Sequence, residues 1–219
     1  MKVKKITLKS DDAARVPAAL DAANIPFEPI ACVDWPRDYP YCPEAAFRIA
    51  HTESALLIHY RVKEQSVRAR YDYDNGQQWT DSCVEFFSQP AGDDIYYNIE
   101  CNCIGNILMA AGPTREGREK APQEALHLIR RWASLGDKGI FEEQRRETAW
   151  QVALIVPYAA FFKHHLAILD GHSVRANFYK CGDELMEPHF LSWQPIRLPK
   201  PDFHRPDFFG VLEMEPSAE

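Results

Sequence analysis

Acidic and amide side chains alternate with apolar residues along two neighbouring segments of the chain. Asp81 and Glu85 are separated by an even number of residues, so they would point to one side of a strand. Asn98, Glu100 and Asn102 would share one side of the next segment for the same reason. Because carboxylates and amides hydrogen-bond well to hydroxyl groups, the two rows predict the polar floor of a carbohydrate site. The alternative is a solvated outer face, or hydrogen bonds to loops.

Two tryptophans could supply the flat apolar surface on which the C–H face of a sugar ring packs. Trp79 follows two glutamines, where an aromatic side chain could be exposed, and Trp193 lies in a stretch bounded by proline. Packing in the core or at its rim explains either residue equally well. The other tryptophans, Trp35, Trp132 and Trp150, fit a packing role better.

A third segment could complete the polar floor. Arg175 and Asn177 alternate along it and would add a cationic donor and an amide. An arginine–glutamate pair within a sheet is also a common structural device, so a purely structural role stays open for Arg175.

Glu85 and Glu100 could instead be the acid and base of a glycoside hydrolase, which needs two carboxyl groups about 5–10 Å apart beside a cleft. The sequence does not give that distance, and small sandwich domains usually lack such a cleft. We therefore expect a protein that binds a sugar without catalysing a reaction, with glycoside hydrolysis as the alternative.

No metal ligands are assigned from the sequence. The six cysteines contain no C-x-x-C pair and are expected to be free thiols: Cys32, Cys42, Cys83, Cys101, Cys103 and Cys181. Asp72, Asp74 and Asn75 resemble part of a calcium loop, but the spaced glutamate of an EF-hand is missing. A turn is the better interpretation of that stretch.

The composition narrows the class of partner. Hydrophobic residues make up 46% and charged residues 26% of the 219 residues, which fits a globular core. The net charge of -7 argues against nucleic acid as the main partner. No apolar run approaches the ~20 residues that span a membrane, and no secretory signal follows the first lysines. We expect no membrane partner and a cytoplasmic location, unless a leader has been removed.

Short segments of period two, separated by turn residues, predict an all-β fold. Strands are expected at residues 55–62, 66–73, 83–87, 95–103, 105–112, 147–157 and 173–181. The 83–87 and 95–103 strands should form a hairpin. Helical turns are expected at residues 13–22, 122–132 and 158–164. This pattern indicates an antiparallel β-sandwich, immunoglobulin-like or jelly-roll-like, with one or two short helices.

Prolines are frequent in the first 45 residues, which excludes long helices and central strands there. One short strand at residues 3–8 fits between them. We expect residues 1–45 to wrap around a core of residues 46–213, so that residues 1–219 form a single domain.

Several stretches resemble a known family. Trp79–Phe87 is similar to the W-x-D-S-x-V-E-F-F signature of family 9 carbohydrate-binding modules and their relatives. Tyr96–Gly105 is similar to the Y-x-N-x-E-x-N-x-x-G pattern of a bacterial subgroup of those relatives. Further agreement, in the same order, comes from Arg175–Tyr179, His189–Trp193 and Phe203–Gly210. The resemblance covers roughly residues 45 to 213.

This resemblance implies a sandwich that binds a mono- or oligosaccharide, with a terminal sugar clamped between two tryptophans and, in the better-known modules, structural calcium. The chain departs from those modules at Asn98, where they would offer a basic residue. Related sandwiches bind haem through methionine and histidine, which makes Met109, Met186 and His189 alternative ligands. A module whose aromatic surface binds a protein partner is a further alternative.

Overall fold

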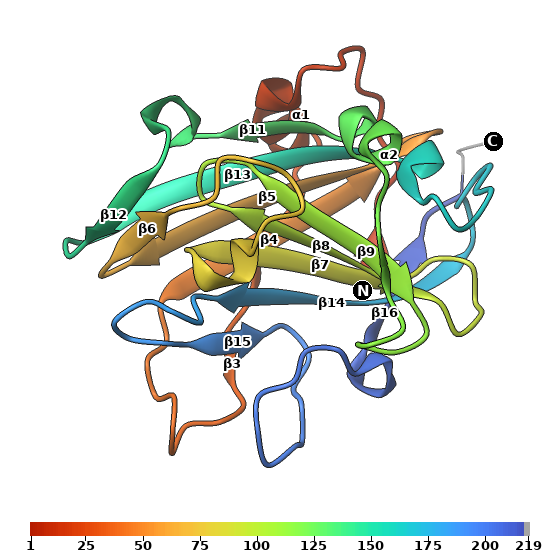
Figure 1. Ribbon diagram of the computed structural model, residues 1–219. Helices are drawn as coiled ribbons and strands as arrows, with labels where there is room; N and C mark the ends of the chain where they lie inside the picture. Colours follow the sequence, from red (N-terminus) through yellow and green to blue (C-terminus); the bar gives the residue numbers. More distant parts are fainter. Residues whose placement is uncertain (217–219) are drawn as a thin grey trace.

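Two facing β-sheets form the body of the protein in the computed structural model, which describes residues 1–216 (Figure 1). Sheet A has the order β1 (Lys2–Val3), β16 (Gly210–Met214), β14 (Ser173–Cys181), β7 (Cys83–Gln89), β8 (Tyr96–Asn102), β9 (Ile107–Gly112) and β10 (Glu119–Lys120). β15 (Phe190–Ser192) also pairs with β14, and β3 (Cys32–Val33) pairs with β15. Sheet B has the order β11 (Arg130–Ala133), β13 (Thr148–Pro157), β5 (Ala55–Glu64), β4 (Glu44–His51) and β2 (Glu28–Pro29). A separate ribbon pairs β6 (Val67–Ala69) with β12 (Phe141–Gln144).

All pairings between these strands are antiparallel except that of β1 with β16. The predicted antiparallel β-sandwich is therefore confirmed.

Alternation along each strand places one set of side chains between the sheets. Phe47 of sheet B stacks on Phe178 of sheet A with ring centroids 3.5 Å apart, and Phe86 lies 5.0 Å from Phe178. Each of these rings is fully buried, and burying one contributes about 1.5–3 kcal/mol. The two sheets are held together mainly by this apolar layer.

The expected helix near the N-terminus covers the far side of sheet B. A 3₁₀ turn at Ala13–Arg15 leads into α1 (Val16–Ala22), and the Asp12 side chain caps the turn by accepting from the Ala14 amide. Val16 and Leu20 form a small apolar cluster with residues of β4, β5 and β13. The N-terminal segment thus covers the outside of sheet B with α1, and its strand β3 then pairs with β15 of sheet A before the chain enters β4 (Figure 1).

A second apolar layer lies on the outer face of sheet A. Residues 183–209, here called the covering segment, run across β14 and β7 and include β15 (blue in Figure 1). Tyr179 stacks on Phe203 of this segment with ring centroids 4.0 Å apart, and the Trp35 indole donates to the Leu198 carbonyl. Sheet A is therefore buried on both faces over most of its area, which gives its outer side chains an environment unlike that of a solvated sheet.

Most predicted elements are confirmed. The strands at 55–62, 83–87, 95–103, 105–112, 147–157 and 173–181 are present, and the 83–87 and 95–103 strands form the hairpin β7–β8. Two expectations were too long: the 66–73 strand is reduced to β6, and the 3–8 strand to β1. The 158–164 turn is a single 3₁₀ turn at Tyr158–Ala160.

The predicted helix at 122–132 is wrong in its second half. Helix α2 (Gln123–Leu128) is followed directly by β11, where Trp132 pairs with Ala153 of β13. Completing the edge of sheet B outweighs the helical spacing of the apolar residues there.

No helix in the described part of the chain is long and apolar enough to span a membrane.

Candidate carbohydrate-binding site

A cavity of about 240 Å³ opens on the outer face of sheet A, where the covering segment leaves part of β7, β8 and β9 free. Its polar lining consists of Glu85, Glu100, Arg115, Arg118, Lys120, Asp183, Asp202 and His204. Its aromatic lining consists of Trp79, Phe190 and Phe203. The volume is below the ~300–1,000 Å³ of sites for drug-sized ligands, so the cavity fits a ligand of about one sugar ring.

The floor of the cavity is a pair of glutamates. Glu85 of β7 and Glu100 of β8 are directly opposite one another, and only 2% and 4% of their surfaces are exposed. Burial raises the pKa of Glu85 well above its usual value, and the neighbouring Glu100 raises it further. Burial also raises the pKa of Glu100 to about 7. The Oε2 atom of Glu100 is buried without a hydrogen-bond partner among residues 1–216, so it is an acceptor available to a ligand.

A chain of hydrogen bonds connects this floor to a cationic wall. The Asn98 amide donates to Glu100 Oε1 over 2.8 Å, and Arg118 Nη1 donates to Asn98 Oδ1 over 2.7 Å. Asn98 is itself fully buried beneath Arg118. The guanidinium of Arg118 comes from the segment between β9 and β10, and its remaining N–H groups include donors for a ligand. A basic residue is therefore present near this position, but it is Arg118, which lies above Asn98 and is hydrogen-bonded to it.

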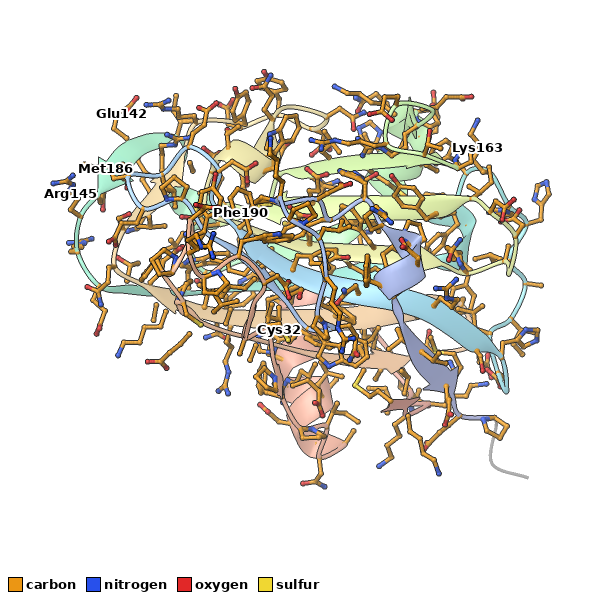
Figure 2. The ribbon with its side chains drawn as sticks, turned by 90° about the horizontal axis from the view of Figure 1, so that it is seen from below. Cys32, Glu142, Arg145, Lys163, Met186 and Phe190 are labelled. Atoms are coloured by element: carbon orange, nitrogen blue, oxygen red, sulfur yellow. The ribbon has the colours of Figure 1, made fainter. Side chains whose placement is uncertain are left out.

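Aromatic side chains form the sides of the cavity. Trp79 lies in a 3₁₀ turn (Gln78–Thr80) just before β7, and its carbonyl accepts from the Asp183 amide over 3.1 Å. Its half-buried indole packs against the same apolar layer as Phe190 and Phe203. Phe190, labelled left of centre in Figure 2, is the first residue of β15 and pairs with Cys181 at the end of β14. Of the two expected tryptophans, Trp79 is thus at the cavity.

The second expected tryptophan lies elsewhere. Trp193 packs edge-on against Phe47 and Phe178, with ring centroids 5.6 and 5.9 Å apart. It is only half-buried but is not part of the cavity lining. The expected pair of tryptophan platforms is therefore not formed at this cavity, because the second indole packs against the core of the sandwich. Phe190 and Phe203 are the other aromatic side chains of the cavity.

Asp81 and Asn102 hold the backbone beside the cavity rather than facing it. The carboxylate of Asp81 accepts from the amides of Arg70 and Tyr71 at 2.9–3.2 Å. The Asn102 amide donates to the Tyr71 carbonyl and to Asp81 over 2.7 and 3.1 Å. Both side chains are fully buried, so their hydrogen-bonding capacity serves the fold.

Arg175 and Asn177 also lie outside the cavity. Asn177 is fully buried and bonds the backbone of Gln194 twice, at 2.9 and 3.0 Å, which anchors the covering segment. Arg175 is exposed and donates to the Pro206 carbonyl over 2.5 Å. The expectation that these two residues complete the polar floor is not met, because the covering segment occupies that part of the sheet.

Arg118, Asp183 and Phe203 were missed in the sequence. Arg118 belongs to the charged stretch 115–120, which has the composition of a solvated loop. Asp183 and Phe203 belong to segments with no strand pattern, so nothing placed them near β7 and β8. The only available signal was the proximity of Asp183 to the last predicted strand.

The alternative interpretations find less support in the geometry. Glu85 and Glu100 lie side by side on one floor, so they cannot flank a glycosidic bond from two sides as a hydrolase requires. Met109 is fully buried between the sheets, whereas Met186 is 59% exposed and contacts Arg145 at the left edge of Figure 2. Both ring nitrogens of His189 are engaged, one with Lys180 and one with the Glu187 carbonyl. The three residues do not form a haem ligand set.

A two-sheet sandwich with a small recess of aromatic and hydrogen-bonding side chains has the features of a module that binds a small polar ligand such as a sugar. The chain belongs to carbohydrate-binding family 9, whose model matches residues 14–214. Members of this family are binding modules, so the chain is a non-catalytic module.

Solved structures agree with this assignment. The chain is 50% identical to a candidate carbohydrate-binding protein from Bacteroides uniformis ATCC 8492, with 98% of each chain covered and a TM-score of 0.95. It is 10% identical to a family 9 module from Caldicellulosiruptor kristjanssonii in complex with cellotriose, covering 100% of this chain and 96% of that one, with a TM-score of 0.62. A glucose complex of a family 9 module from the same organism gives 11% identity, coverage of 100% and 97%, and a TM-score of 0.56. These last two likenesses show the fold alone. No curated protein matches the chain.

Proposed function

We propose that the cavity binds one unit of a mono- or oligosaccharide without catalysis. Trp79 packs against the C–H face of the sugar, as an indole does with flat apolar surfaces. Glu85 and Glu100 accept hydrogen bonds from its hydroxyl groups, and Arg118 donates to its oxygens. Asn98 acts from below by holding both Glu100 and Arg118 in place.

One observation carries this proposal. The unpartnered Oε2 of Glu100 is buried at the floor of a cavity that also contains a half-buried indole. Nearly all buried acceptors in native proteins have a partner from the protein, water or a ligand, so this oxygen takes its partner from the cavity. A hydroxyl group from a ligand would satisfy it, and the sugars in the two Caldicellulosiruptor complexes carry many such groups.

Calorimetry with glucose, galactose, xylose, cellobiose and cellotriose tests the proposal. Trp79→Ala is expected to weaken binding at least tenfold, since an aromatic contact contributes about 0.5–1.5 kcal/mol beyond the area that it buries. Glu100→Gln is expected to weaken it about 2- to 10-fold, because it perturbs a hydrogen bond to a buried carboxyl group that contributes about 0.5–1.5 kcal/mol. A glycan array extends the search to other sugars.

Two control variants sharpen the result. Trp193→Phe changes a tryptophan outside the cavity, and Glu213→Gln changes an exposed glutamate of β16. Both are expected to bind as the unchanged protein does. Binding lost in Trp193→Phe but kept in Trp79→Ala would move the site away from this cavity, and binding of no sugar at all would refute the function.

A further inference from the structure

Three metal-ligating side chains converge below the cavity. Cys83 of β7 is directly opposite Cys181 of β14, and Glu85 lies two residues further along β7 on the same face. The two sulfur atoms and a carboxylate oxygen all lie within 4.8 Å of one another. Cys181 Sγ is only 2.9 Å from Glu85 Oε1. The group is built from adjacent strands of one sheet, so its positions are set by the most rigid part of the fold.

The cluster has access to the cavity and a candidate fourth ligand. Glu85 and Asp183 both line the cavity, and Asp183 lies beside Cys181. The backbone amide of Asp183 is fixed by its hydrogen bond to the Trp79 carbonyl. Glu85 thus belongs both to the cavity lining and to the cluster, and Asp183 is a second carboxyl group of the cavity next to Cys181.

These acidic groups form no ion pair within residues 1–216. At most 2% of each of Cys83, Glu85 and Cys181 is exposed, and in that part of the chain no cation pairs with Glu85 or Asp183. Buried charges in proteins are normally paired or coordinate a metal, and a bound divalent ion would stabilise the deprotonated forms of all four groups.

We propose that Cys83, Glu85 and Cys181 bind a zinc-like divalent ion at the base of the cavity. Two thiolates and a carboxylate form a donor set that suits zinc and does not suit calcium, which takes oxygen ligands only. Each metal–sulfur bond forms as the thiol releases its proton to solvent, and the Glu85 carboxyl group releases its proton in the same way. The fourth position faces Asp183 and the cavity. The site does not depend on sugar binding, so it would stand even if no sugar binds.

Cobalt titration of the reduced, chelator-treated full chain tests this site in the absence of sugar. One equivalent of Co²⁺ is expected to produce sulfur-to-cobalt charge-transfer absorption and intense tetrahedral bands, which one equivalent of Zn²⁺ then removes. Cys83→Ser and Cys181→Ser are each expected to weaken binding about 100-fold, because each ligand contributes a part of the binding free energy of a structural zinc site. Glu85→Gln keeps the charge-transfer band but weakens binding.

Cys42→Ser is the matched control, because Cys42 is exposed and is not part of the cluster. It is expected to bind cobalt as the unchanged protein does. Alanine variants at 83 and 181, checked for folding by circular dichroism, separate ligand loss from misfolding. Absence of a charge-transfer band in the unchanged protein would overturn the proposal. So would a band that survives loss of both cysteines.

Discussion

Replacing Lys180 with methionine should destabilise the protein strongly. Lys180 is fully buried between the sheets, and its Nζ lies 2.9 Å from Glu64 Oε2, 2.7 Å from His189 Nε2 and 2.8 Å from the Cys181 carbonyl. The other oxygen of Glu64 accepts from the Trp150 indole over 2.7 Å. In Lys180→Met, the Glu64 carboxylate would remain buried with that indole as its hydrogen-bond donor and with His189 Nε2 3.7 Å from its second oxygen. Breaking a buried ion pair on one side costs about 3–5 kcal/mol.

The double variant Lys180→Met, Glu64→Gln tests the cause of that loss. Removing both charges leaves no uncompensated ion, and the carbonyl of the new amide side chain can still accept from Trp150. We expect its free energy of unfolding to return to within about 1–2 kcal/mol of that of the unchanged protein, because replacing both partners of a buried pair is often neutral. As a control, Lys163→Met breaks the surface pair with Glu119 and should change stability by less than about 1 kcal/mol.

Urea unfolding of the unchanged protein, Lys180→Met, Glu64→Gln, the double variant and Lys163→Met, followed by tryptophan fluorescence and circular dichroism, gives the required free energies. The reasoning predicts a strong favourable coupling between the substitutions at 64 and 180. It would be refuted if Lys180→Met lost less than about 1 kcal/mol, or if the two substitutions were additive.

Three further predictions concern the core, the pH dependence of stability and the cavity. Phe47→Ala should lower the free energy of unfolding by about 3–5 kcal/mol in urea unfolding, because it empties the stack on Phe178, and a loss below about 1 kcal/mol would contradict that packing. Burial lowers the pKa of His59 to about 4. Between pH 6.5 and 4 only the unfolded chain takes up this proton, so the free energy of unfolding decreases as the pH is lowered. This decrease in the free energy of unfolding should reach up to about 2 kcal/mol by pH 5 and be smaller in His59→Asn. An equal pH dependence of urea unfolding in the two proteins would contradict the prediction. Arg118→Met should weaken sugar binding about 10-fold or more in calorimetry while Arg205→Met, outside the cavity, leaves it unchanged; equal affinities would remove Arg118 from the site.

The sequence predicts the strand-borne half of the cavity and not the half that comes from irregular segments. Glu85 and Glu100 could be placed on one floor because strand alternation and a hairpin between β7 and β8 require it. Arg118 and Phe203 could not, since the position of their segments depends on contacts across the fold. Asn177 points to the expected side of sheet A but is covered by the backbone of Gln194. Strand alternation predicts the face of the sheet toward which a side chain points, but it does not predict what packs over that face.

The covering segment explains how ordinary sheet residues become a binding site. On a solvated outer face, Glu85 and Glu100 would be ionised, and water would compete with any hydroxyl group for them. Because the residues around the recess leave only 2% and 4% of Glu85 and Glu100 exposed, a hydrogen bond to either carboxyl group is stronger than on an open face, and an unfilled acceptor such as Glu100 Oε2 is unfavourable. The segment is tied down from outside the cavity by Asn177 and by Trp35. At the proposed site, we therefore expect a recess of about 240 Å³ to take a single sugar unit rather than an extended chain, which would need an open and flatter surface.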